Sequence, residues 1–335
     1  MVTSTISRCG AARGLTALLL AVSAATVSPT GMAQAAFPSK GITIVVPFPA
    51  GGGPDLTARI IAEKLAPRLG QAVIVENKPG AGALLGASAV AKSAPDGHTL
   101  LLTPNTMVIS PHVLPPGAGG GIDVQKDLVP VIAPATTPLV LVANPQLGVT
   151  TLKAALDAAR KSPGIAYGSA GNGSPMHFAG EMLKKSAQVD LLHVPYRGVA
   201  PSITAVLSGE VKLLYVSLGG AVPHIKAGKL VPLAVTEKAR SALLPTVPTA
   251  TEQGVPNVEV NAWYGIFAPS GTPAAAIMRI NTEVNEVLKM ADVRDKLTAA
   301  GIEVLGGTPQ VLGDFMKADN QRYGSLAKEL NIKAD

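Results

Sequence analysis

The most restrictive feature of this sequence is an arrangement that recurs along it, in which a short β-branched run ends in glycine and proline and continues into a helical pattern. The run at 42–46 leads into VPFPAGGGPD, and residues 56–69 then place apolar side chains on one helical face. The loops GSAGNGSP (168–175) and PYRGVAP (195–201) follow later runs in the same way. This alternation predicts an α/β fold with a mostly parallel sheet and helices on both faces.

Residues 1–35 have the features of a secretory signal peptide: a basic start, an apolar stretch of small residues at 15–27 and the cleavage pattern Ala33-Gln34-Ala35. We predict cleavage after Ala35 and export to the periplasm, which leaves 300 of the 335 residues. The one cysteine, Cys9, is lost with the leader, so no disulfide is expected. No later segment reaches about 18 uninterrupted apolar residues, and we expect the exported protein to be soluble.

The charge of the chain limits its partners. The leader holds two arginines and no acid, so its removal lowers the net charge from +6 to +4. The chain has no block of five basic residues and almost no aromatic residues among its basic ones, so nucleic acid is not an expected partner.

The length that remains suggests two lobes. Prolines separate the strand-like runs at 128–133 and 139–143, and the run at 230–235 could return the chain to the first lobe. We therefore expect lobe 1 at 36–134 plus 236–335, lobe 2 at 135–235, and a hinge near 133–137 and 235–238. Two crossovers leave a cleft between the lobes, and small ligands commonly bind in such clefts.

The glycine-rich loops suit an anion. Glycine lets the backbone come close to a ligand, and the helix that follows offers unpaired N–H groups and the positive end of its dipole. Asp55 and Ser174 are expected to cap these helices, next to Pro54 and Pro175. A phosphate or a carboxylate would fit, and for either loop alone an ordinary tight turn remains the alternative.

Motifs for other chemistry are absent or poor matches. No G-x-x-x-x-G-K-[ST] occurs, and in GAGALLG (80–86) the third glycine is one place late for a dinucleotide fingerprint. No two histidines have metal-ligand spacing, and Ser174 lacks a G-x-S-x-G context. We expect no cofactor, no metal and no catalysis.

Seven stretches together resemble the Bug-type receptors, the periplasmic substrate-binding proteins of tripartite tricarboxylate transporters. In chain order they are FPSKGITIVVPFPAGGGPDLTAR, LGQAVIVENKPGAGALLGASAVAKSAPDGHTLLL, YGSAGNGSPMHFAGEMLK, HVPYRGVAPSITAVLSGEV, PHIKAGKLVPLAVT, LPTVPTATEQGVPNVEVNAWYGIFAPSGTP and GGTPQ. The resemblance implies a type II periplasmic binding-protein fold with two α/β lobes. It also implies a bound carboxylate, which depending on the member is a di- or tricarboxylate, an amino acid or an aromatic acid.

The resemblance also implies where the ligand binds. The loops at 48–55 and 169–174 match the family's two ligand-gripping loops, whose backbone N–H groups and ordered waters hold the carboxylate. The candidate ligand-binding residues are Phe48, Ala50, Gly51, Gly52, Gly53, Asp55, Thr103, Asn105, Ser169, Ala170, Gly171, Asn172, Ser174, Arg197 and Gly198.

Several of these roles stay open at this point. Asp55 is either a helix cap or a ligand contact, Phe48 either stacks on the ligand or packs over its loop, and Arg197 is either a carboxylate clamp or a solvated turn residue. Trp263 and Tyr264 are expected in the core or the hinge.

The predicted function is a monomeric periplasmic receptor that captures a small organic acid and delivers it to a tripartite membrane permease. The segment VSLGG at 216–220 lacks the acidic residue that many relatives have there, which would accept bonds from an amino or hydroxyl group of the ligand. Its absence argues weakly against an amino-acid ligand. Two alternatives remain: an exported enzyme that acts on a carboxylated substrate in the same cleft, and a ligand-binding sensor for a signalling partner.

Overall fold

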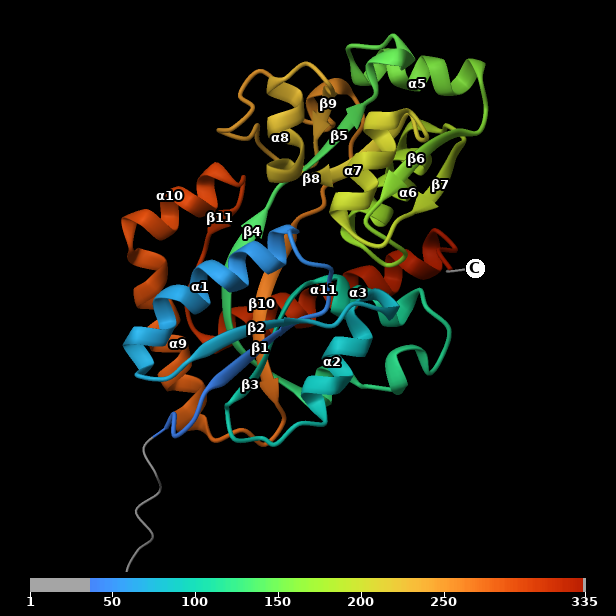
Figure 1. The fold of residues 1–335 in the computed structure, drawn as a ribbon. Helices are drawn as coiled ribbons and strands as arrows, with labels where there is room; N and C mark the ends of the chain where they lie inside the picture. The colour runs from blue at the N-terminus through green and yellow to red at the C-terminus, as the bar shows by residue number, and fades with distance from the viewer. Residues whose placement is uncertain (1–36, 334–335) are drawn as a thin grey trace, which may run out of the picture. The chain divides into compact units, whose positions relative to one another are not determined.

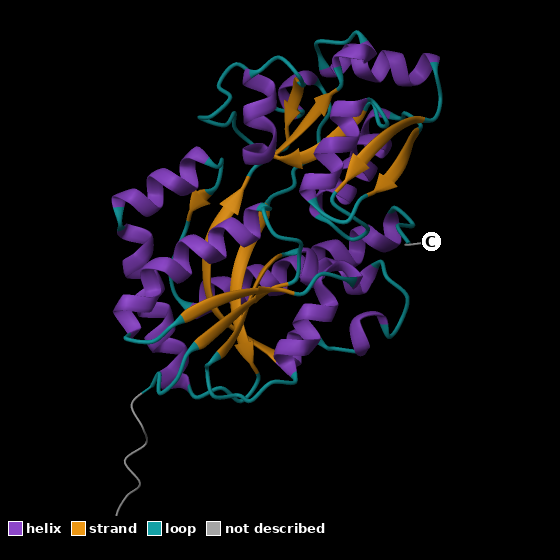
Figure 2. Ribbon diagram, in the orientation of Figure 1, coloured by secondary structure: helices purple, strands orange, loops and turns teal. Residues whose placement is uncertain are grey.

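A computed structural model describes residues 37–333, which form two α/β lobes, each built on its own sheet (Figures 1 and 2). The predicted signal peptide and its cleavage site at Ala35 lie outside the described residues. Within 37–333, no helix combines the length and the apolarity needed to cross a bilayer.

The first lobe contains a six-stranded sheet in the order β11-β4-β10-β3-β1-β2. β1 pairs in parallel with β2 and β3, and β10 runs antiparallel to β3 and β4. The strands are β1 (Ile42–Val46), β2 (Val73–Asn77), β3 (Thr99–Pro104), β4 (Leu128–Thr137), β10 (Ala262–Pro269) and β11 (Glu303–Val304). The helices are α1 (Gly53–Leu69), α2 (Leu84–Ala91), α3 (Thr106–Ile109), α4 (Val124–Asp127), α9 (Ala274–Lys289), α10 (Ala291–Ala299) and α11 (Pro309–Glu329).

Helices cover both faces of this sheet. Ile42, Ile44 and Val46 of β1 pack with α1, α9 and α10, whereas Val45 packs on the other face with α2, α3 and α11. Successive side chains of a strand point to opposite faces. A strand that is covered on both faces therefore favours apolar residues on both, which accounts for β1 being apolar at every position except Thr43.

The second lobe contains a five-stranded sheet in the order β7-β6-β8-β5-β9. α5 and α6 cover one face of it, and α7 and α8 cover the other. Its strands are β5 (Leu139–Ala143), β6 (Ile165–Ser169), β7 (Leu191–Pro195), β8 (Leu213–Ser217) and β9 (Val231–Val235). Its helices are α5 (Leu152–Lys161), α6 (Pro175–Ala187), α7 (Val199–Ser208) and α8 (Leu218–Lys226).

The crossovers between the lobes differ from those expected from the sequence. β4 stays in the first sheet as far as Thr137, and β5 of the second sheet begins only two residues later. β9 belongs to the second sheet and does not return to the first lobe, and the segment after it, from Leu244 to Val260, packs on the second core. We therefore propose lobe boundaries at 137–139 and near 260–262, in place of 134/135 and 235/236.

Small residues let the two lobes touch. A Cβ atom added to Gly219, at the start of α8, would overlap the carbonyl oxygen of Ala300, which follows α10 in the other lobe. A Cβ atom on Gly173 would lie 2.8 Å from Cα of Ser110. α11 also joins the lobes, since its first half packs in the first core and Tyr323 packs in the second. The described arrangement therefore depends on close backbone contact between the lobes.

Candidate functional site

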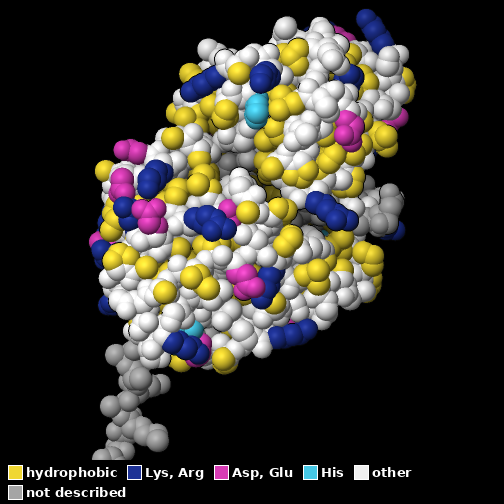
Figure 3. All heavy atoms as spheres, viewed as in Figure 1, with side chains coloured by type: hydrophobic (Ala, Val, Ile, Leu, Met, Phe, Trp, Pro, Cys, Tyr) yellow, Lys and Arg dark blue, Asp and Glu magenta, His cyan; other side chains and the backbone are white. Residues whose placement is uncertain are grey.

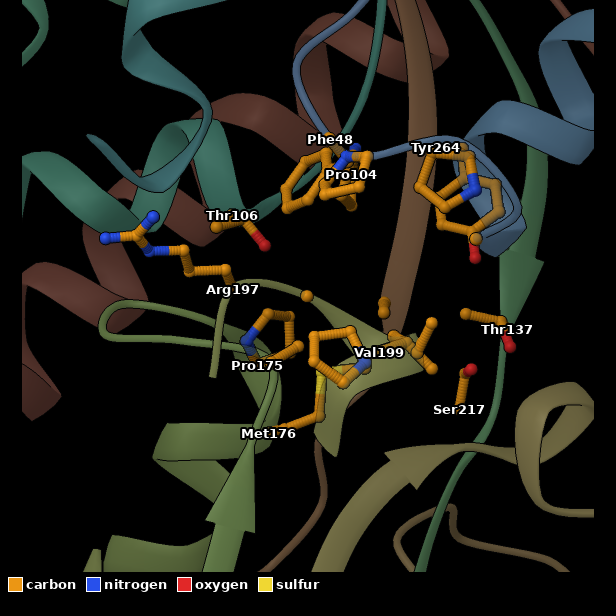
Figure 4. Close-up of a pocket in the computed structure, with 18 of the residues that line it drawn as sticks. Phe48, Pro104, Thr106, Thr137, Pro175, Met176, Arg197, Val199, Ser217 and Tyr264 are labelled. Carbon is orange, nitrogen blue, oxygen red and sulfur yellow. The ribbon is translucent and has the colours of Figure 1, made fainter. Parts of the chain in front are cut away.

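A cavity of about 50 Å³ lies between the lobes, and we call it the inner cavity (Figure 4). Figure 3 shows a hollow in this region of the surface, bordered by apolar side chains. The lining residues are Phe48, Pro49, Ala50, Gly52, Pro54, Pro104, Thr106, Thr137, Ala170, Pro175, Met176, Arg197, Gly198, Val199, Ala200, Pro201, Ser217, Ala262 and Tyr264. Prolines and other apolar groups make up most of this wall, and no acidic side chain of residues 37–333 belongs to it.

Four helices begin at the wall of the inner cavity. α1 begins beside Gly52, α6 at Pro175, α7 beside Gly198 and α8 beside Ser217. A helix start carries a partial positive charge and unpaired backbone N–H groups. The start of α1 belongs to the first lobe and the other three starts belong to the second, so positive helix ends from both lobes meet at a cavity that no acidic side chain of residues 37–333 lines.

Backbone N–H groups from both lobes are free at this wall. Within residues 37–333, the N–H groups of Ala50, Gly52, Ala170 and Gly198 have no hydrogen-bond partner. All four residues line the inner cavity. Because unpaired amides away from water are costly, these groups are available to an anion or to water.

The first loop, residues 48–55, is held by Asp55. Its Oδ2 accepts hydrogen bonds from the N–H of Gly51 (2.9 Å) and from Nε of Arg59 (3.0 Å), and its Oδ1 accepts from Nδ2 of Asn77 (2.9 Å). Asn77 also donates to the carbonyl oxygen of Phe48 (3.0 Å). Burial opposes ionisation of Asp55, but the hydrogen bonds from Arg59, Gly51 and Asn77 outweigh it and hold the pKa of Asp55 below its ordinary value.

Two expectations for this loop are wrong. Asp55 is not the N-cap of α1, because the helix already begins at Gly53 and Gly52 holds the N-cap position. Asp55 is the third helical residue, and its carboxylate braces the loop from outside the cavity lining. The N–H of Gly51 is occupied by Asp55 and is not free for a ligand.

The second loop, residues 169–174, is held by hydroxyls and an imidazole. Ser174 caps α6, as expected, by accepting a hydrogen bond from the N–H of His177 (3.2 Å). In return, the N–H of Gly173 donates to Nδ1 of His177 (3.3 Å). Ser169 Oγ accepts from the N–H of Gly171 (3.1 Å). Ser169 and Ser174 are buried and line neither cavity, so they shape the loop from behind.

The structure pairs Ser169 with a residue that the sequence did not connect to it. Oγ of Ser169 lies 2.7 Å from Nε2 of His193 on β7, and the ring of His193 stacks on that of His177 with centroids 3.8 Å apart. Because Ser169 is fully buried, this pair does not face a substrate as a nucleophile and its base would. In the sequence, 24 residues separate the two partners, and no local pattern joins them.

A larger outer cavity of about 430 Å³ adjoins the inner one, and both share Phe48, Ala170, Arg197 and Gly198. Gly171 and Asn172 line only the outer cavity. The side chain of Arg197 is exposed, and its guanidinium extends away from the centre of the inner cavity (Figure 4).

Three further candidates lie away from both cavities. Thr103 is buried and its hydroxyl donates to the carbonyl oxygen of Pro104 (3.2 Å). Asn105 is also buried, and its Nδ2 donates to Asp319 (2.8 Å) and to the carbonyl oxygen of Asn261 (3.1 Å). Their contact with the ligand stays a prediction, although the end of β3 buries both side chains away from the two cavities. Gly53 follows the lining residue Gly52 but is not itself part of the wall.

Polar side chains that the sequence did not single out reach the inner cavity. Thr106, Ser217 and Tyr264 bring hydroxyl-bearing side chains to its wall from three separate segments (Figure 4). Thr137 also lines it, but its hydroxyl donates to the carbonyl oxygen of Gly301 (3.3 Å). Burial raises the pKa of Tyr264, so its hydroxyl stays protonated and can donate a hydrogen bond to an anion. Tyr264 was expected in the core or hinge, and its position on β10 places it there as well as at the cavity.

Two α/β lobes around an anion-suited cavity define a two-lobed solute-binding protein. The chain belongs to the family described as "Tripartite tricarboxylate transporter family receptor", which matches residues 57–332. This confirms the resemblance found in the sequence and the expected two-lobed α/β fold. The prediction of a mostly parallel sheet is wrong, because β10, β11, β5 and β9 pair antiparallel and both sheets are mixed. Among the described residues, no group of three or more His, Cys, Asp or Glu side chains is placed to hold a metal ion.

Three relatives illustrate the family. Protein BugT of Bordetella pertussis is 33% identical over 94% of this chain and 98% of its own length. An R. palustris protein solved with adipate is 33% identical, with a TM-score of 0.84 over 89% of this chain and 99% of its own. MatC from Rhodopseudomonas palustris, solved with bound malate, is 32% identical, with a TM-score of 0.80 over 87% of this chain and 99% of its own.

Proposed function

We propose that this protein is a periplasmic receptor that captures a small organic carboxylate in the inner cavity. The observation that carries the proposal is that four residues with unpaired N–H groups, Ala50 and Gly52 in one lobe and Ala170 and Gly198 in the other, line one cavity at which four helices begin. An anion that accepts from both sets holds the two lobes together. Binding thus favours the closed arrangement by the difference in affinity between open and closed forms.

The free energy that helix starts can contribute is small compared with the free energy of binding. One helix start contributes about 0.3–1 kcal/mol, and about 2 kcal/mol when partly buried. Micromolar binding needs about 8 kcal/mol. Four exposed helix starts therefore contribute at most about 4 kcal/mol, and about 8 kcal/mol only if all four are partly buried. Directed N–H bonds to a charged acceptor are needed to supply the rest and to offset the cost of removing the anion from water.

The lining also argues for a class of carboxylate. A ligand with an ammonium group would lose its hydration without gaining an acidic partner, because no acidic side chain of the described residues lines the inner cavity. Hydroxyl groups of Thr106, Ser217 and Tyr264 can serve polar substituents, and the prolines suit an apolar body. Adipate and malate, the acids bound by two relatives, both lack an ammonium group.

A thermal-shift and calorimetric panel tests the proposal. We expect at least one acid among adipate, malate and simple aromatic carboxylates to raise the melting temperature, since a ligand at 100 times its Kd adds about 2.7 kcal/mol to stability. Malate and aspartate form a matched pair that exchanges a hydroxyl for an ammonium group, and we expect malate to bind better. Stabilisation by neutral sugars or by cations, with none by acids, would contradict the ligand class.

The proposal extends to a partner and a location. Export through the leader at 1–35, with cleavage after Ala35, is tested by sequencing the N-terminus of the protein recovered from the periplasm. Delivery to a tripartite permease is tested by uptake of the stabilising acid in cells with and without this gene. Two competing functions have their own readouts: turnover of the acid, followed by mass spectrometry, would indicate an enzyme, and ligand-dependent signalling without uptake would indicate a sensor.

A further inference from the structure

Two histidines, of which His177 is buried and His193 is half-buried, lie behind the second loop without lining either cavity. His177 belongs to the first turn of α6 and His193 to β7, and their rings stack with an interplanar angle of 8°. The ligand-binding arrangement described above does not use them directly. Their contacts show what they can do indirectly, because each ring bonds to a different part of the loop.

His177 holds the end of the loop that enters α6. The N–H of Gly173 donates to its Nδ1 (3.3 Å), and an N–H can donate only to a nitrogen that carries no proton. His177 is also the third residue of α6, where a positive charge would lie at the positive end of the helix dipole. This bond therefore requires the neutral ring.

His193 holds the beginning of the loop. Its Nε2 lies 2.7 Å from Oγ of Ser169, which in turn accepts from the N–H of Gly171 (3.1 Å). Between Ser169 and Gly171 lies Ala170, which lines the inner cavity and has an unpaired N–H. The two rings together thus fix both ends of the segment that presents Ala170 and Asn172 to the cleft.

The surroundings of the pair favour two neutral rings. Burial first, and then the neighbouring His193 and Lys184, lower the pKa of His177 to about 2, and burial and Lys184 lower that of His193 to about 4. Lys184 pairs with Glu181 (2.9 Å), and Glu181 also accepts from the hydroxyl of Tyr167 (2.8 Å). Among the described residues, Lys184 acts on both rings, Tyr167 packs against His193 with centroids 5.0 Å apart, and Glu181 bonds to both Lys184 and Tyr167.

We propose that His177 and His193 are positioning residues for the second loop, and that the loop keeps its binding shape only while His177 is neutral, so that acidification weakens ligand binding. This inference rests on the proposed receptor function for its effect on affinity, but not for its effect on the loop. If the loop opens to water, each ring regains its ordinary pKa, so acid favours the open loop progressively below about pH 6.5.

The first test needs no ligand. Hydrogen exchange of the Gly173 and Gly171 amides is measured at pH 7 in the wild-type protein and in two matched pairs of variants, H177N with H177L and H193Q with H193L. Asn places an acceptor near the position of Nδ1, and Gln places a polar atom near that of Nε2, whereas Leu supplies neither. We expect the Leu variants to lose about tenfold in protection, which corresponds to one lost hydrogen bond, and the amide variants to keep it.

The second test measures the Kd for adipate, or for malate if adipate does not bind, between pH 7 and pH 5. The wild-type Kd should rise at least about tenfold relative to that of the H177N/H193Q double variant, while H224N, a histidine of α8 outside the pair, follows the wild type. Titration of the probe acid itself is common to all variants and cancels in the ratio.

Parallel pH profiles for the wild type and the double variant would overturn the proposal, as would equal Gly173 protection in H177L and H177N. If H177L does not fold, the pH profile of the double variant still decides. If neither acid binds at pH 7 while the exchange results are as expected, the positioning role stands and the proposed receptor function fails for these acids.

Discussion

Each of the two ligand loops is closed by a hydrogen bond between equivalent positions, but the acceptor is a carboxylate in the first loop and an imidazole in the second. In the first loop, the third residue of α1, Asp55, accepts from the N–H of Gly51, which precedes the N-cap. In the second, the third residue of α6, His177, accepts from the N–H of Gly173, which also precedes the N-cap. This is the return bond of a capping box, moved back by one residue.

The two braces differ in how they respond to pH. A carboxylate at the third helical position is favoured by the helix dipole and stays charged at neutral pH. An imidazole at this position can accept the hydrogen bond only as the neutral ring. The protonated ring has no acceptor nitrogen, and its positive charge is repelled by the positive end of the helix dipole. The first loop should therefore be stable across mildly acidic pH, and the second should not.

The two loops can share one cavity only when the lobes are in contact. Gly219→Ala should disturb this contact and cause the largest loss of affinity among the variants considered. The added Cβ would overlap Ala300 of the other lobe, so the lobes could not approach as described. We expect a loss of roughly 100-fold in affinity for the stabilising acid, measured by calorimetry, with both lobes still folded by circular dichroism. Gly313→Ala, inside α11 with its Cβ 3.6 Å from Pro130, is the matched control and should bind normally.

The second prediction concerns His193 and pH. The pKa of His193 is lowered to about 4 in the folded protein, so between about pH 6.5 and 4 the unfolded chain binds more protons. The free energy of unfolding should then fall with decreasing pH, by roughly 2 kcal/mol between pH 6.5 and 5 for this residue, and stay level above pH 6.5. Denaturant unfolding of the wild type and H193Q at each pH measures this contribution as their difference. A constant difference across the range would contradict it.

The third prediction concerns the brace of the first loop. Asp55→Asn keeps the shape of the side chain but removes its negative charge and one of its two acceptor oxygens, which weakens the bonds from Arg59 and from the N–H of Gly51. We expect the free energy of unfolding to fall by about 1–2 kcal/mol. Asp157→Asn, at an exposed i,i+4 pair with Lys153, is the control and should change stability less. The effect of Asp55→Asn should not vary between pH 7 and pH 5, because the pKa of Asp55 is lowered. A pH-dependent effect in that range would remove the contrast between the loops.

The smallest prediction concerns Arg197, at the border of the inner and outer cavities. Its side chain is exposed and directed away from the inner cavity, so we expect Arg197→Ala to weaken acid binding by less than about fivefold. The loss should shrink at 1 M salt, where exposed charges are screened. A loss of 100-fold that resists salt would instead place a carboxylate directly on the guanidinium.

Much of the fold and part of the site follow from local chemistry in the sequence. The strand at 42–46 has the predicted bounds, and Pro175 correctly marks the first turn of α6. The role of Gly219 near the start of α8 could not be predicted, because it depends on where the two lobes touch. The amide-bearing loops could be predicted because strand, glycines and helix start are adjacent in the chain.

The braces of the loops could not be predicted. The bond between Ser169 and His193 depends on the parallel pairing of β6 with β7, and the position of Tyr264 at the cavity depends on β10 returning to the first sheet. Asn105 follows the end of β3, as a ligand contact would, but tertiary packing turns it towards Asp319. Such placements are set by contacts between distant segments, which no local pattern records.

The most direct test of the central claim is a ¹H–¹⁵N NMR titration with the acid that most raises the melting temperature. We predict that the amide signals of Ala50, Gly52, Ala170 and Gly198 move together and saturate at the Kd found by calorimetry, because their N–H groups all donate to one bound carboxylate or its waters. Saturable binding that leaves these four signals in place, or moves only one lobe's pair, would contradict the account.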